Sequence, residues 1–126
     1  MTTRIDTRPS PGPQRGEIWL IHFDPSVGDE IRKLRRAVVL SLNQIGRLQL
    51  RIVVPVTGWD DAYEERPWMV PLEPSRRNGL TKPSAADGFQ VKSVSLERFA
   101  RRVGHLEEPW LEEIAAAVAL CVGFSR

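Results

Sequence analysis

The sequence predicts one small, mainly β domain that ends in a single helix. Three observations lead to this expectation: apolar runs with strand-like alternation fill the first half, shorter strand-like runs separated by turns follow, and the clearest helix signals stand near the C-terminus. The 126 residues, 41% of them hydrophobic, suffice for one core and are too few for two domains. Short, closely spaced strands with one terminal helix favour a small β barrel over an alternating α/β sheet.

The N-terminal residues 1–14 are rich in Thr, Pro and Arg and are expected to form a disordered tail, so that the single domain covers residues 15–126. The first strand is expected from Glu17 to Phe23, because apolar side chains occupy most of both of its faces. Asp24-Pro25 then ends it.

Two more strands are expected, one from Ala37 to Leu42 and one from Leu48 to Thr57, joined by a tight turn at Gly46. The period of two in the later run puts Arg51 and Thr57 on the face opposite the aliphatic side chains. That aliphatic set is Leu48, Leu50, Ile52, Val54 and Val56.

The second half alternates polar connections with short runs. A polar, mobile loop is expected over residues 58–65, and Ser95 is expected to cap a brief helical turn over residues 96–100. Pro71 confines one of the short strands to an edge or an end of the sheet. The short strands are expected at Trp68 to Leu72, Ser84 to Ala86 and Phe89 to Val94, with a basic turn at Arg76 to Gly79.

The terminal helix is predicted by its boundary residues. Pro109 suits a first helical position, glutamates around it complement the helix dipole, and Gly123 closes the helix. Helical spacing predicts an apolar stripe that packs on the sheet. The stripe consists of Trp110, Leu111, Ile114, Ala115, Val118 and Val122.

Charge and cysteine content say little about partners. The formal net charge is +2, but fifteen Arg accompany three Lys, and the planar Arg fork suits phosphate geometry. Base composition of the gene or ordinary surface charge explains the same excess. The single cysteine, Cys121, excludes an intramolecular disulfide and fits a reducing cytoplasm. No apolar run is long enough to span a membrane.

Several motifs bring phosphodiester chemistry to adjacent strand ends. Their order predicts a guanidinium, carboxylates and a hydroxyl at one edge of a small sheet, a set suited to a phosphodiester. They are Arg15-Gly16-Glu17-Ile18-Trp19, Gly28-Asp29-Glu30, Arg35-Arg36 and Val53-Val54-Pro55-Val56-Thr57.

On these motifs the chain resembles the MazF/PemK family of toxin endoribonucleases, from about residue 15 to about residue 124. The resemblance implies an SH3-like barrel with appended helices and the toxin of a type II toxin-antitoxin pair. It implies cleavage of single-stranded RNA through the 2′-hydroxyl, without metal or cofactor, to give 2′,3′-cyclic phosphate and 5′-hydroxyl ends. It also implies a homodimer and an antitoxin whose disordered C-terminal segment covers the RNA groove.

The family pattern assigns roles to three residues. Arg35 matches the catalytic arginine placed just before the second strand, and would clamp the phosphate. Thr57 matches the hydroxyl residue that ends the third strand, and would donate a hydrogen bond to a phosphoryl oxygen. Glu30 matches the acidic residue of the Gly-x-Glu loop, as an orienting or substrate-contacting group. The general base stays unassigned.

Further substrate contacts are expected from Asp29, which stands beside Glu30, and from Gln90 and Lys92 in a Gln-centred strand of the family. Trp59 is expected to stack a base or to pack at a partner interface. Arg36 stands where the family usually has Pro, which adds charge beside the site. A second departure is Phe89, which occupies a position that is often acidic.

Each candidate also has an ordinary structural explanation, such as a solvated carboxylate or a salt-bridged arginine. His22 and His105 have no partners that resemble a triad or a metal set, so no metal is predicted. Two other functions stay open: a non-enzymatic toxin of the CcdB type that binds a protein target such as DNA gyrase, and a catalytically lapsed RNA-binding module.

Overall fold

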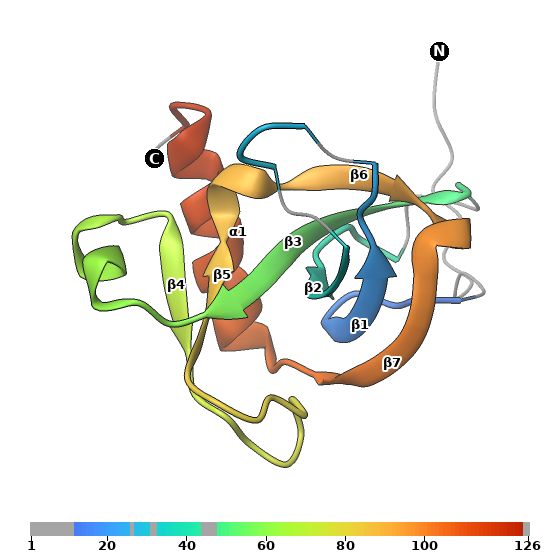
Figure 1. The fold of residues 1–126 in the computed structure, drawn as a ribbon, viewed down its shortest axis with the longest axis horizontal. Coiled ribbons are helices and arrows are strands. Elements are labelled where there is room, and N and C mark those ends of the chain that lie inside the picture. The colour runs from blue at the N-terminus through green and yellow to red at the C-terminus, as the bar shows by residue number, and fades with distance from the viewer. Residues whose placement is uncertain (1–11, 26, 31–32, 44–47, 125–126) are drawn as a thin grey trace.

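The computed structural model describes residues 12–25, 27–30, 33–43 and 48–124 (Figure 1). The expected tail up to residue 11 and the expected turn at Gly46 lie outside the described residues. The domain begins before the expected boundary at Arg15, because Pro13 is buried and its carbonyl accepts a hydrogen bond of 2.9 Å from the Arg51 Nε.

Seven antiparallel strands form one sheet, in the order β4-β5-β3-β2-β1-β7, with β6 paired beside β3 (Figure 1). The expectation of a mainly β fold with one C-terminal helix is confirmed. Within the described residues no ladder joins the edge strands β4 and β7, so backbone hydrogen bonds do not close the sheet into a barrel. The strands are β1 (Glu17–His22), β2 (Leu34–Val39), β3 (Leu50–Gly58), β4 (Met69–Leu72), β5 (Ser84–Asp87), β6 (Lys92–Ser95) and β7 (Phe99–His105).

Strand β1 pairs regularly with β2 on one side and irregularly with β7 on the other. Its pairing with β7 shifts between Ile18 and Trp19 and again between Leu20 and Ile21. At each shift β7 has one residue more than β1, Val103 at the first and Ala100 at the second, so the irregularity lies in β7. Ile18 and Ile21 are both fully buried because alternation puts them on opposite faces of β1, and each face meets one of two apolar clusters in the interior.

The long strand β3 inverts the expected pattern at its start. Arg51 is 8% exposed, whereas Leu50 and Ile52 are 48% and 44% exposed. Burial of the guanidinium lowers the pKa of Arg51. Its buried donors are satisfied by main-chain carbonyls of Pro13, Leu48 and Leu50. Arg51 lies on the face opposite Leu50 and Ile52, as expected, but at this end of β3 the face of Arg51 is the buried one. The N-terminal segment packs there and supplies the Pro13 carbonyl as an acceptor.

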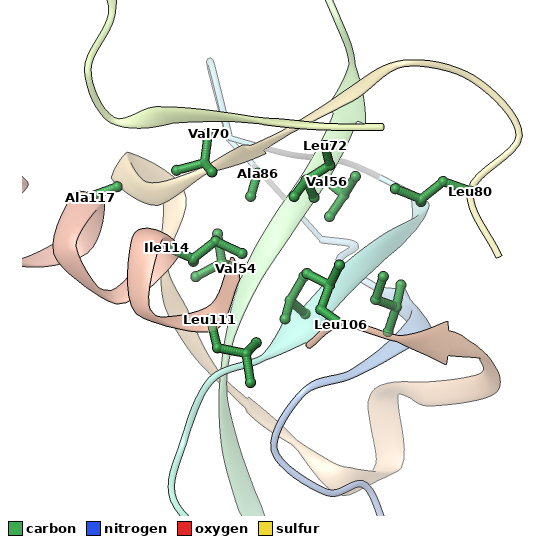
Figure 2. Close-up of a cluster of buried hydrophobic side chains, with 12 residues drawn as sticks. Val54, Val56, Val70, Leu72, Leu80, Ala86, Leu106, Leu111, Ile114 and Ala117 are labelled. Atoms are coloured by element: carbon green, nitrogen blue, oxygen red, sulfur yellow. The ribbon is translucent and has the colours of Figure 1, made fainter. Parts of the chain in front are cut away.

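The interior has two clusters of apolar side chains, and β3 contributes to both with Val53 and Val54. One cluster lies between the sheet and the C-terminal helix α1 (Glu108–Cys121), as Figure 2 shows for Val54, Val56, Val70, Leu72, Leu80, Ala86, Leu106, Leu111, Ile114 and Ala117. The other joins Ile21, Phe23, Ala37, Val39, Val53 and Val94. A strand that crosses between two cores is buried on both faces, which explains its run of aliphatic residues.

Helix α1 begins and ends close to the expected positions, with Pro109 in its first turn and Gly123 at a φ of +78° beyond its end. Its buried residues are Leu111, Ile114 and Ala117. The expected stripe is wrong at its ends, since Trp110 and Val122 are 41% and 75% exposed. Figure 1 shows the C-terminal end of the helix extending past the sheet, and Val122 directly follows that end.

The segment after β5 differs most from expectation. Residues 88–90 form a short 3₁₀ helix, η2 (Gly88–Gln90), before β6, so the expected strand over Phe89 to Val94 is shorter. Ser95 caps η3 (Leu96–Arg98) as expected, by accepting a 3.3 Å hydrogen bond from the Glu97 amide. Strand β7, which follows directly, was not predicted, because adjacent arginines and Gly104 hide its alternation.

Candidate functional site

Arg35 and Thr57 lie together, as their place in the motifs predicts. Strands β2 and β3 pair Ala37 with Pro55 and Val38 with Val54, and the same register continued by two residues puts Arg35 opposite Thr57. Both residues line one cavity of about 210 Å³. Arg35 was expected just before this strand. In the structure β2 begins at Leu34, so Arg35 is its second residue.

This cavity, called the Arg35 cavity below, carries cations and hydroxyls but no carboxylate. The Arg35 side chain is exposed and forms no hydrogen bond or ion pair among the residues that the structure describes. The Nε of Arg36 is buried and has no hydrogen-bond partner there. Unpaired donors in a concave, positively charged site suit an anion. The lining residues are Leu34, Arg35, Arg36, Val56, Thr57, Gly58, Leu80, Thr81, Lys82 and Ser84.

The predicted residues Asp29, Glu30, Gln90 and Lys92 form a separate cluster. The Gln90 amide donates a 3.1 Å hydrogen bond to the Asp29 carbonyl, and the Lys92 ammonium lies 3.9 Å from the Glu30 carboxylate. Glu30 also accepts a 3.0 Å hydrogen bond from the Val27 amide. Because none of these residues lines the Arg35 cavity, no contact of Glu30 with Arg35 exists in this structure.

Trp59 lines a neighbouring pocket of about 470 Å³, which shares Ser84 with the Arg35 cavity. Its ring meets that of Tyr63 edge-on at 5.7 Å, and its Nε1 donates a 3.2 Å hydrogen bond to Asp61. The expected mobile loop contains a 3₁₀ helix, η1 (Asp61–Glu65), capped by Asp60, whose carboxylate accepts from the Ala62 amide at 2.9 Å. The described backbone of this segment is therefore a defined turn with an aromatic pair.

Sequence reasoning assigned no role to Thr81 or Lys82, which the structure brings into the Arg35 cavity. The turn before them is fixed by Asn78, whose buried side chain accepts from the Ser75 and Leu80 amides at 2.9 Å. Gly79 has a φ of +68°, and a Cβ there would lie 2.4 Å from the Val103 carbonyl oxygen. The sequence signal was the Asn-Gly pair, which predicts the turn but not where it aims the next residues.

Neither a metal site nor a membrane span is found in the described parts of the chain. No group of three or more His, Cys, Asp or Glu side chains there is placed to hold a metal ion. No described helix is long and apolar enough to cross a bilayer.

The ionised Asp87 carboxylate lowers the stability of the fold by an amount that depends on pH. Burial raises the pKa of its carboxyl, against the opposing effects of hydrogen bonds from the Phe89 and Gln90 amides and of the Arg66 charge. A raised pKa in the folded state means that its contribution to stability is fully present below the ordinary pKa of aspartate. That contribution is lost as the pH rises through the raised value.

Asp87→Asn is therefore expected to raise the free energy of unfolding at neutral pH and to change it little near pH 3, at about or below the ordinary pKa. The side-chain amide of this variant keeps an oxygen that can accept a hydrogen bond from the backbone N–H of Phe89. In this structure the Asp87 carboxylate accepts that bond at 3.1 Å. Urea unfolding across this pH range is the measurement. Asp87→Ala is the control, because it also removes the acceptor. An equal gain at both pH values would contradict the assignment.

Comparisons with known proteins show which family and which relatives this chain is similar to. The family model described as "PemK-like, MazF-like toxin of type II toxin-antitoxin system" matches residues 14–122. Endoribonuclease MazF9 of Mycobacterium tuberculosis is 31% identical over 113 residues, which cover 85% of this chain and 93% of the relative. Endoribonuclease toxin ChpB of Escherichia coli is 31% identical over 104 residues, 79% of this chain and 85% of the relative.

Solved structures show the same fold at lower identity. MazF from Deinococcus radiodurans superposes with a TM-score of 0.71 at 22% identity, covering 89% of this chain and 97% of its own. A mycobacterial endoribonuclease in complex with its cognate antitoxin gives a TM-score of 0.70 at 16% identity, covering 91% of this chain and 99% of its own.

Proposed function

The chain belongs to the PemK-like, MazF-like family of type II toxins, and from this we propose that it is an endoribonuclease that cleaves single-stranded mRNA without a metal. The observation that carries the proposal is the Arg35 cavity, where an unpaired arginine and a strand-end hydroxyl face each other across two paired strands. An arginine and a hydroxyl placed in this way can bind a phosphate and stabilise the negative charge that develops on it.

The reaction would be a transesterification within the RNA. The 2′-oxygen attacks the adjacent phosphorus, the bond from phosphorus to the 5′-oxygen breaks, and a 2′,3′-cyclic phosphate and a 5′-hydroxyl result. Arg35 would bind the nonbridging oxygens, and Thr57 would donate to one of them as charge develops. The 2′-hydroxyl loses a proton and the 5′-oxygen gains one.

We leave the group that accepts the first proton unassigned. Glu30 is paired with Lys92 outside the Arg35 cavity, so as placed here it would contact flanking nucleotides, together with Asp29 and Gln90. Arg36 would add to the attraction for phosphate from the cavity itself. Trp59, on the wall of the next pocket, would stack a neighbouring base.

End-group analysis of RNA treated with the purified protein tests this function. New 5′ ends are expected to accept phosphate from a kinase without prior dephosphorylation, and 3′ ends are expected to resist extension until the cyclic phosphate is opened. Products with 5′-phosphates would exclude the proposed reaction. Since mRNA is the substrate, we place the activity in the cytoplasm.

We further propose that the toxin acts as a homodimer. Strand β4 is an edge strand, and beside it a groove of about 950 Å³ runs along helix α1. Leu120 and Phe124, which line this groove, are 49% and 59% exposed. A second copy that covers this face would bury them in an isologous interface.

Light scattering is expected to give twice the chain mass of 14.3 kDa.

An antitoxin with a disordered C-terminal segment is the proposed inhibitor, supported by the complex of the mycobacterial relative with its antitoxin. Laid over Arg35, Arg36 and Trp59, that segment would exclude RNA. A peptide of the segment is therefore expected to compete with RNA; a monomer, or simultaneous binding of both, would contradict this arrangement.

A further inference from the structure

The Arg35 cavity contains an ammonium group for which the proposed mechanism has no use. Lys82 lies in the connection between β4 and β5, and its side chain lines the cavity together with Arg35 and Thr57. The ammonium has no ion pair and no hydrogen bond with any other side chain or carbonyl of the described residues. The Ser84 hydroxyl donates a 2.8 Å hydrogen bond to the Lys82 carbonyl, which helps to fix the backbone from which the side chain extends.

The end of the Lys82 side chain lies against Gly58, the residue directly after Thr57 in β3. A Cβ added to Gly58 would lie 3.1 Å from both the Cε and the Nζ of Lys82. A Cβ at position 58 would therefore press on the end of the lysine side chain and displace it by a few tenths of an ångström, and a larger side chain would displace it further. Thr57 and the ammonium consequently lie at the same end of β3.

Electrostatics explains why a second cation would matter. Arg35, Arg36 and Lys82 line one cavity that has no acidic lining residue. Like charges held close together repel, so an anion is needed to compensate them. A phosphodiester carries one negative charge, and attack by the 2′-oxygen places more charge on the phosphoryl oxygens. A cation beyond Arg35 therefore favours the transition state over the bound substrate.

We propose that Lys82 contacts the scissile phosphate together with Arg35, and that Gly58 provides the space for its ammonium. This inference rests on the proposed ribonuclease function and adds to it a catalytic residue and a steric requirement.

Lys82→Ala is expected to lower kcat/KM by about tenfold to a hundredfold, the effect of one hydrogen bond to a charged group. Most of the loss should be in kcat, because the contact strengthens in the transition state. The slope of log affinity against log salt should fall by about 0.7, as for one phosphate contact on a single strand. Lys82→Arg should restore most of the activity, which a merely structural role would not require.

Gly58→Val tests the steric part, since its side chain would take the place of the ammonium. The decrease in kcat/KM of Gly58→Val should resemble that of Lys82→Ala. The double variant should be little less active than either single variant. Arg76→Ala is the matched control: it removes an exposed cation from the same connection but outside the cavity lining. Circular dichroism and thermal unfolding of each variant separate loss of contact from loss of fold.

Binding of an uncleavable 2′-deoxy oligonucleotide, followed by fluorescence anisotropy, separates this inference from the function on which it rests. If the wild type binds but cuts no RNA, the proposed function fails, and a lower affinity and salt slope in Lys82→Ala would still support the phosphate contact. If the wild type cuts RNA and Lys82→Ala cuts within twofold of it with an unchanged slope, the inference is wrong and the function stands. A wild type that neither binds nor cuts overturns both.

Discussion

Arg35→Ala is expected to lower the rate of RNA cleavage by about a hundredfold or more, because it removes a charged donor aimed at the reacting phosphate. The fold should persist. The Arg35 side chain is exposed near the start of β2 and has no hydrogen bond or ion pair within the described structure. Loss of such a side chain changes stability by about 0.5 kcal/mol or less. Single-turnover cleavage of a labelled oligonucleotide, with thermal unfolding of the same sample, is the measurement.

Arg101→Ala is the matched control for this variant. Arg101 is also an exposed arginine within a strand, in β7, and lines neither the Arg35 cavity nor the Trp59 pocket. The Arg101→Ala variant should cleave at the wild-type rate, which separates a local effect at Arg35 from a general loss of positive charge. Thr57→Ala should slow cleavage by less than Arg35→Ala, since a neutral donor contributes less than a charged one. Wild-type cleavage by Arg35→Ala would remove the central residue of the proposed mechanism.

A single 2′-deoxy substitution at the cleavage site is expected to abolish cleavage there, because the substrate supplies the nucleophile in the proposed reaction. The same assay should proceed in EDTA at the rate seen without it. Arg35, Arg36 and Lys82 line the cavity, so charge stabilisation is assigned to these side chains.

A 2′-deoxy substitution several nucleotides from the cleavage site is the control, and should leave the rate unchanged. It keeps the length and charge of the strand, so that only the nucleophile differs between the two substrates. Continued cleavage at the deoxy position would mean that water attacks the phosphorus. Activity that appears only after a divalent metal is added would also contradict the mechanism.

Local patterns in the sequence determined much of this protein. The apolar runs around Ile21, Val38 and Val54 specified three antiparallel strands, and Pro109 and Gly123 bounded the helix close to its observed ends. Such features depend on neighbours within one element, so their period and boundary residues can be read directly. The motif order also predicted that Arg35 and Thr57 would meet, because each stands at the end of one of two paired strands.

The tertiary structure alone decided the rest, because those features depend on residues far apart in the chain. Arg51 is buried since carbonyls of Pro13, Leu48 and Leu50 accept its donors, and one of these comes from a segment nearly forty positions away. Strand β7 exists because β1 pairs with it, despite a sequence without clear alternation.

The site shows the same division. Motif order predicted the Glu30 carboxylate at the same sheet edge as Arg35, but Glu30 pairs with Lys92 in a separate cluster. Lys82 reaches the cavity through a turn whose direction is fixed by packing of Gly79 against Val103. Sequence periodicity specifies which face of an element is apolar. It does not specify which distant loop will be brought over that face, because the packing free energy that selects the loop belongs to the assembled sheet.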